Sequence, residues 1–169
     1  INGNRRDVSK LAILDWSEIR DRAIKFSAEW KDETNENAEA KSFWNDFFNI
    51  FGISRRRVAT FEERVSKLEG TGFIDLLWKG VLLIEHKSRG KDLNKAYNQA
   101  IDYFPGLKES ELPKYILVSD FERFALHDLE TGVKREFELK NLQKNIELFG
   151  FIAGYQKQEF KEQDPVNIK

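Results

Sequence analysis

The sequence contains no cysteine, no methionine and only two histidines, His86 and His127. Without cysteine there is no disulfide scaffold, no thiolate metal site and no cysteine nucleophile, which fits a reducing cytoplasm. Two histidines are too few for a multi-histidine zinc site. Apolar runs are short, as in Val81–Ile84, so the sequence predicts no membrane span and no signal peptide. Because even position 1 is not methionine, we expect the chain to be a piece of a longer protein.

Charged and aromatic side chains, by contrast, are abundant. The 169 residues are 34% charged and include 14 phenylalanines, enough for one domain with an aromatic core. The net charge is only −1, yet residues 51–95 carry 10 basic and 6 acidic side chains. A basic stretch of this kind attracts polyanions such as nucleic acid, although an ordinary solvated surface explains it equally well. The basic residues in question include Arg55, Arg56, Arg57, Lys87, Arg89 and Lys91.

The hydrophobic spacing predicts an α/β domain over residues 1–155, followed by a charged linker over 156–169. Two strands in the middle of the chain are apolar on both faces, which is typical of strands that lie inside a sheet with helices on either side. Residues 58–61 fit the start of a strand, and residues 62–68 fit either a helix or an extended segment. The other predicted elements are helices at 15–31, 37–51, 91–103 and 141–149, strands at 73–78, 81–87 and 115–118, and a polar outer hairpin formed by 121–129 and 133–139.

The two central strands carry their few charges at Asp75 and at Glu85-His86-Lys87. Charges in such apolar strands are costly and therefore indicate a function. Two carboxylates and an amine on neighbouring strands fit a metal-dependent phosphodiester site. The carboxylates would bind a hard cation such as Mg²⁺, and Lys87 would orient a water or stabilise charge on the phosphate. A structural ion pair at a strand end is the competing interpretation.

The same spacing occurs a second time, at Asp128 and Glu138-x-Lys140. This copy lies on a segment with a polar face, which suggests the edge of a sheet. Ordinary solvated charges explain it there, but they do not explain the copy that follows Val81–Ile84. We therefore assign the chemistry to the first copy.

A shared metal requires Asp75 and Glu85 to face the same side of the sheet. A two-residue turn at Lys79-Gly80 would place them on opposite faces, because side chains alternate along a strand. A three-residue loop, Trp78–Gly80, brings them together with Lys87. The sequence therefore predicts an odd-length loop or a bulge with Gly80 at positive φ, and it predicts that His86 and Ile84 point to the other side.

The stretch from Gly72 to Gly90, GFIDLLWKGVLLIEHKSRG, resembles the PD-(D/E)xK nuclease superfamily, with Asp75, Glu85 and Lys87 in the motif positions. Within that superfamily it is similar to the N-terminal nuclease domain of the MmeI-like (type IIL) restriction-modification enzymes. One departure is Ile74, which stands where the superfamily has a proline.

This likeness runs from about Ala38 to Leu129, with a weaker echo at Asp164–Lys169. It implies a restriction-endonuclease-like fold, a central mixed sheet flanked by helices, in a bacterial cytoplasmic protein. It also implies cleavage of double-stranded DNA with Mg²⁺, or Mn²⁺ as a substitute, and a transient oligomer for cutting both strands. An adenine methyltransferase that uses S-adenosylmethionine and a target-recognition domain would lie downstream.

The resemblance also implies roles for further residues. Asp75, Glu85 and the backbone carbonyl of His86 would ligate the metal, while the His86 side chain is a packed one. Glu39, on the first core helix, would face the metal, although an exposed helix glutamate fits it equally well. In the element Gln99-x-x-x-Tyr103, Gln99 would contact a phosphate or order the site, and Tyr103 is assigned to the core.

Two other functions remain open at this point. The Gln-x-x-x-Tyr element permits a RecB-like repair exonuclease. The other is a non-catalytic nucleic-acid-binding or interaction module on a nuclease fold that has lost its activity. Such a loss usually leads to replacement of the costly charged residues, and here the Asp/Glu/Lys set is intact.

Overall fold

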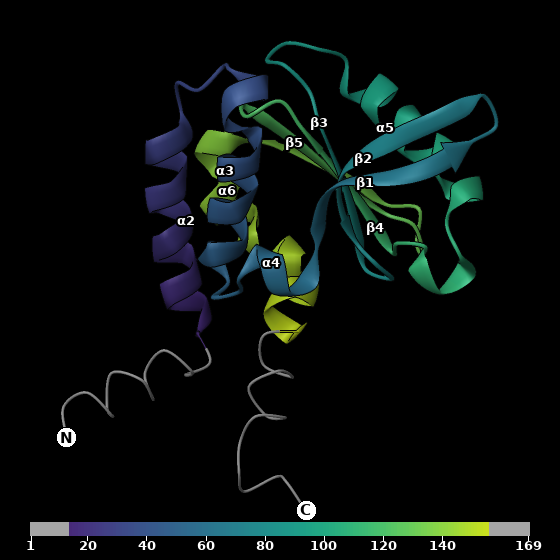
Figure 1. Ribbon diagram of the computed structural model, residues 1–169. Helices are drawn as coiled ribbons and strands as arrows, with labels where there is room; N and C mark the ends of the chain where they lie inside the picture. The colour runs from purple at the N-terminus through teal and green to yellow at the C-terminus, as the bar shows by residue number, and fades with distance from the viewer. Residues whose placement is uncertain (1–13, 156–169) are drawn as a thin grey trace, which may run out of the picture.

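A computed structural model describes residues 14–155 of the chain (Figure 1). The predicted linker at 156–169, including the segment Asp164–Lys169, lies outside the described residues. The described part contains a six-stranded sheet in the order β1-β2-β3-β4-β5-β6. Strands β3 and β4 are parallel and the other neighbours are antiparallel, so the predicted mixed sheet is confirmed. The strands are β1 (Thr60–Lys67), β2 (Gly70–Trp78), β3 (Leu82–His86), β4 (Tyr115–Ser119), β5 (Arg123–Asp128) and β6 (Lys134–Glu138).

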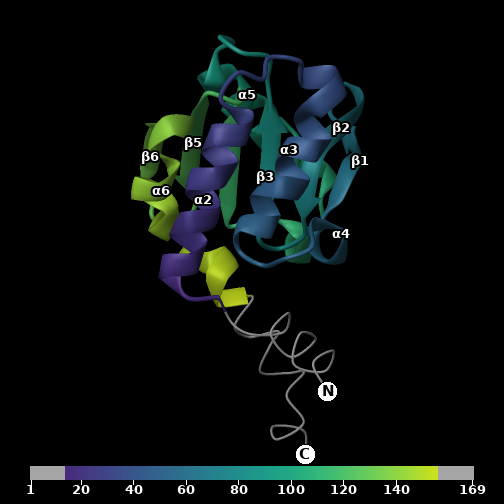
Figure 2. The same ribbon diagram turned by 90° about the vertical axis from the view of Figure 1, so that its left-hand side faces the viewer.

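Helices cover both faces of this sheet (Figures 1 and 2). Helices α2 (Trp16–Trp30), α3 (Glu36–Ile50) and α6 (Leu142–Asn145) pack on one face, and α5 (Leu93–Asp102) packs on the other. Because both faces are covered, all five side chains of β3 are buried, as the apolar pattern predicts. None of the helices in residues 14–155 is long and apolar enough to cross a membrane.

The starts of the first two helices follow from polar side chains in the sequence. The Asp15 carboxylate accepts a hydrogen bond from the backbone N–H of Glu18 at 2.8 Å, and the Asn35 side chain accepts one from Ala38 at 3.1 Å. Each satisfies a backbone donor that the first helical turn leaves unpaired. Gly52, at φ 73°, ends α3 as predicted.

The core between α3 and the sheet consists mainly of aromatic rings. The ring of Phe43 lies 4.9 Å from that of Phe26, 5.0 Å from Trp44 and 5.1 Å from Phe121, centroid to centroid. Aromatic pairs at such distances prefer tilted and edge-to-face contacts. These contacts allow α3 only one rotation about its axis, and that rotation decides which of its side chains reach the end of β3.

The structure decides one segment that the sequence left open and differs from the predictions in two others. After a short helix, α4 (Arg55–Val58), strand β1 (Thr60–Lys67) covers most of residues 58–68, so the extended alternative is correct for this segment. The predicted outer hairpin forms from β5 and β6, but only β6 is polar, because Phe124, Ala125 and Leu126 on β5 are buried. The predicted helix 141–149 consists of α6 and a 3₁₀ segment, η4 (Ile146–Phe149).

The hairpin β2–β3 has the predicted odd-length loop, but the loop begins one residue later. Trp78 pairs with Leu82, so the loop is Lys79–Val81 rather than Trp78–Gly80. Trp78 stays in the strand because its ring packs on Phe48 at 5.9 Å and on Tyr155 at 5.0 Å. Gly80 has φ 78°, as predicted. Because the loop still has an odd number of residues, the side chains that the sequence placed on one face stay together, and Asp75 lies level with Glu85.

Candidate active site at a fork between two strands

The candidate active site lies where β2 and β3 part. The ladder between them ends at Leu76 and Ile84, although each strand continues beside its other neighbour. Beyond that point, hydrogen bonds to side-chain carboxylates replace the backbone hydrogen bonds between the two strands. The N–H of Asp75 donates to the carboxylate of Glu85 at 3.3 Å, and the N–H of His86 donates to the carboxylate of Asp75 at 2.7 Å. The two carboxylates thus fill the fork from opposite strands.

The fork holds these two acids in an environment that disfavours two negative charges. Burial, together with the nearby charge of Asp75, raises the pKa of Glu85 to about 8. Burial also raises the pKa of Asp75, against the lowering effect of the hydrogen bond from His86 and the charge of Lys87. Carboxylates this close do not both ionise easily unless a cation joins them.

Lys87 extends from the end of β3 towards α5. Its ammonium donates a hydrogen bond to the side-chain oxygen of Gln99. The amide of Gln99 donates to the Tyr103 hydroxyl at 3.3 Å, and that hydroxyl donates to the carbonyl of Phe73 at 2.9 Å. Tyr103 is buried, as predicted, and burial raises its pKa to about 12. This chain of hydrogen bonds ties Lys87 to both arms of the fork.

The His86 side chain points to the opposite face of the sheet, as predicted, and is packed. Its imidazole lies 4.3 Å from the ring of Phe121, and its Nδ1 accepts a hydrogen bond from Trp44 Nε1 at 3.0 Å. Burial lowers the His86 pKa to about 4, so the ring is neutral at physiological pH. The proton therefore sits on Nε2, which is buried without a partner among the described residues. With Nδ1 bonded to Trp44 and Nε2 buried, the imidazole presents no exposed nitrogen to a metal at Asp75 and Glu85.

The structure brings Glu36, rather than Glu39, to the fork. A cavity of about 130 Å³ opens beside Asp75. The Glu36 carboxylate accepts a hydrogen bond from Ser88 Oγ at 2.6 Å, and its charge contributes to the raised Asp75 pKa. Glu39, one turn further along α3, does not line the cavity. The lining residues are Glu36, Asn37, Ala40, Lys41, Trp44, Phe61, Glu62, Asp75 and His86.

A signal for Glu36 exists in the sequence, but it needs one tertiary contact. Trp44 touches His86, and steps of four residues back along α3 lead to Ala40 and then Glu36. The sequence alone does not say that Trp44 marks the face of α3 that turns to the fork.

Much of the basic stretch serves the structure. Arg89 donates hydrogen bonds to the carbonyls of Lys31 and Glu33 and forms an ion pair with Glu122 at 3.1 Å. Arg55 donates to the Asn45 side chain and to the Ala59 carbonyl. These two cations are engaged within the fold, so the linear charge count overstates the positive surface that is free for a polyanion.

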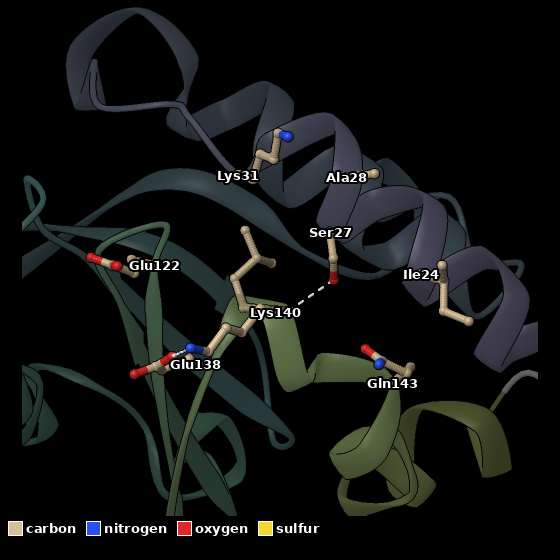
Figure 3. Close-up of a pocket in the computed structure, with 9 residues that line it drawn as sticks. Ile24, Ser27, Ala28, Lys31, Glu122, Glu138, Lys140 and Gln143 are labelled. Atoms are coloured by element: carbon tan, nitrogen blue, oxygen red, sulfur yellow. Dashed lines mark hydrogen bonds and ion pairs between the residues drawn. The ribbon is translucent and has the colours of Figure 1, made fainter.

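The second Asp and Glu-x-Lys pattern does not form a site. Glu138 pairs with Arg123 at one end of β5, while Asp128 is at the other end and binds the backbone of the turn. Lys140 forms an exposed ion pair with Glu138 at 3.0 Å. Both line a cavity of about 410 Å³ between α2 and the end of β6, where Ser27 Oγ donates to the carbonyl of Leu139 (Figure 3). The interpretation of this copy as surface charge is confirmed.

Within residues 14–155, no three acidic, histidine or cysteine side chains gather in a group that could hold a metal ion. At the fork the side-chain donors are two carboxylates, and oxygen donors of this kind suit a hard divalent cation. Further ligands would have to come from the backbone, from water or from a substrate phosphate. A mixed sheet whose central strands part around an Asp and a Glu-x-Lys defines a restriction-endonuclease-like domain of the PD-(D/E)xK class.

Comparison with known families narrows this class. The family model described as "MmeI, N-terminal domain" matches residues 21–169, and the chain belongs to that family. A solved structure with a similar chain is a cryo-EM complex of DrdV with DNA, with 14% sequence identity and a TM-score of 0.44. That match covers 89% of this chain and 14% of the DrdV chain, so this chain spans a small part of that protein. None of the curated proteins compared matches this sequence.

Proposed function

We propose that this chain is the DNA-cleaving domain of a restriction-modification enzyme and hydrolyses phosphodiester bonds in double-stranded DNA with Mg²⁺. The observation that carries the proposal is the pair of carboxylates of Asp75 and Glu85, which meet across the fork beside the ammonium of Lys87. Membership of the MmeI N-terminal family supports the nuclease role.

The residues at the fork suit the proposed chemistry. Asp75, Glu85 and the backbone carbonyl of His86 would hold the cation, which when bound polarises the phosphate and lowers the pKa of a water. Lys87, oriented by Gln99, places a positive charge where negative charge develops on the phosphate. Gln99 therefore acts through Lys87 as a positioning residue. Glu36 takes the role that the sequence assigned to Glu39, an acid on the first core helix that faces the metal.

Binding of Mg²⁺ should depend on pH through Glu85. Its pKa is raised from 4.5 to about 8, so between these values the folded protein keeps a proton that the unfolded chain has lost. The free energy of unfolding of the metal-free protein therefore falls as pH rises through this window. Mg²⁺ competes with that proton, so we expect it to raise the melting temperature more at about pH 8 than at about pH 5. Differential scanning fluorimetry with and without Mg²⁺ measures this.

Glu85→Gln is the control for that measurement, because glutamine has the same shape and no proton to exchange. It should lose both the pH dependence and most of the response to Mg²⁺. An equal Mg²⁺ response at the two pH values in the unchanged protein would contradict a cation site at the fork.

The proposal extends to the whole protein in which this domain works. An adenine methyltransferase with S-adenosylmethionine and a target-recognition domain would supply modification and sequence choice, in a bacterial cytoplasm. Mn²⁺ would substitute for Mg²⁺, because both prefer oxygen ligands. A transient oligomer would bring a second active site to the other DNA strand.

A closed circular plasmid distinguishes an endonuclease from the main alternative. The hydrogen bond from Gln99 to Tyr103 fits the Gln-x-x-x-Tyr element of RecB-like exonucleases, which need free ends. We expect the intact enzyme to cut supercoiled plasmid with Mg²⁺ and to leave it uncut in EDTA, as seen on agarose gels. Degradation of linear DNA alone would favour the exonuclease, and no cleavage of either would favour a non-catalytic binding module.

A further inference from the structure

The hairpin of β1 and β2 has one covered face and one open face. On the covered face, Val65 and Ile74 are buried in the cluster that α5 completes. The hairpin is also fastened there by the Tyr103 hydroxyl, which donates to the carbonyl of Phe73. Figure 1 shows the hairpin reaching out from the sheet beside α5. Side chains alternate along a strand, so the intervening residues face the other way.

The open face carries exposed residues that pair with one another next to the fork. Arg64 pairs with Phe73, and Ser66 pairs with Thr71; all four are exposed. Phe73 has 55% of its surface exposed and is one of four large exposed apolar residues in the described part of the chain. Because Phe73 precedes Asp75 by two residues on the same strand, it lies about 6.8 Å along the strand from the fork.

The charged side chains of this face differ in whether they form ion pairs within the described part of the chain. Glu62, which lies level with Asp75, forms an ion pair with Lys41 at 3.1 Å. Arg64, the next residue on this face, has no ion-pair partner among the described residues, and its guanidinium is open to solvent. An exposed arginine beside an exposed aromatic ring suits the phosphate and sugar of a nucleic acid strand.

We propose that the open face of the β1–β2 hairpin, defined by Arg64, Ser66, Thr71 and Phe73, binds duplex DNA beside the phosphate that is cut. Arg64 contacts a backbone phosphate, and Phe73 packs on the adjacent sugar or base edge in the minor groove. This inference rests on the proposed nuclease function, since the face adjoins the fork along β2. It assigns the hairpin the task of holding the strand in line with the metal-binding carboxylates.

Fluorescence anisotropy of a labelled DNA duplex with the full 169-residue chain tests the proposal, with Ca²⁺ in place of Mg²⁺. We expect weak, sequence-independent binding by the unchanged chain. Arg64→Gln should weaken it about tenfold and reduce the slope of log affinity against log salt by about 1. Phe73→Ala should weaken it about fivefold without changing that slope.

Two surface variants elsewhere serve as matched controls. Arg135→Gln removes an exposed arginine from the edge strand β6, and Ile24→Ala removes a residue of similar exposure, 52%, from α2. Both should bind as the unchanged chain does. A second copy of this chain is the other partner that such a face could bind, so light scattering measures the molar mass of each variant in solution.

The proposal is overturned if Arg64→Gln and Phe73→Ala bind DNA as tightly as the controls, or if the unchanged chain binds no DNA. It is also overturned if the two substitutions dissolve a dimer and leave DNA binding unchanged. Its failure is distinguishable from failure of the proposed function. If only the hairpin inference is wrong, Asp75→Asn still eliminates cleavage in the intact enzyme; if the nuclease assignment is wrong, Asp75→Asn cleaves like the unchanged enzyme.

Discussion

Asp75→Asn, Glu85→Gln and Lys87→Met should each lower the rate of Mg²⁺-dependent plasmid cleavage by the intact enzyme by about 10³-fold or more. The first two remove a negative charge that would hold the cation, and the third removes the positive charge beside the phosphate. The first two variants should stay folded, because an amide in place of a buried carboxylate relieves the repulsion that raises both pKa values. Initial rates from gel assays and circular dichroism spectra measure the two effects.

The second copy of the pattern offers matched controls for these variants. Glu138→Gln and Lys140→Met remove the same residue types from an exposed ion pair at the sheet edge. They should cleave at the unchanged rate, since exposed ion pairs contribute little to structure. Equal loss of cleavage in both sets of variants would mean that cleavage depends on the overall charge of the domain rather than on the residues at the fork.

Gly106→Ala should have the largest effect on stability, lowering the free energy of unfolding by about 3 kcal/mol. A Cβ atom at Gly106 would lie 2.1 Å from the backbone carbonyl oxygen of Ser66 on β1. This contact is with the backbone, so no side-chain rotation relieves it. Gly106 ends the 3₁₀ segment η1 (Phe104–Gly106), and the hairpin would have to move away from this segment. Urea denaturation followed by tryptophan fluorescence measures the loss.

Gly150→Ala is the control for that substitution. A Cβ at Gly150 meets nothing within 4 Å, and the residue has helical φ −55° and ψ −29°. Alanine there should be neutral or stabilising by up to about 1 kcal/mol. An unchanged urea midpoint for Gly106→Ala would show that β1 is not held by its close approach to η1.

Much of the fork follows from local sequence. The strands that carry Asp75 and Glu85 are joined by a loop of three residues. Whether the number of loop residues is odd or even decides whether the two side chains share a face. Gly80 supplies the positive φ at no steric cost. Because these are short-range constraints, the pairing of the two acids was predictable even though the loop begins one residue later than predicted.

The hydrogen bond between Lys87 and Gln99 depends on α5, and the position of Glu36 near Asp75 depends on α3, which packs against the opposite face of the sheet. The sequence by itself predicted the mixed sheet, the packed His86 and the approach of Asp75 to Glu85, because spacing and alternation act within a strand or a hairpin. Only the tertiary structure decided between Glu36 and Glu39 and engaged Arg89 with the loop before α3. The physical reason is that periodicity sets which residues share a face, whereas the direction in which that face turns is set by packing of rings such as Phe43 and Trp44.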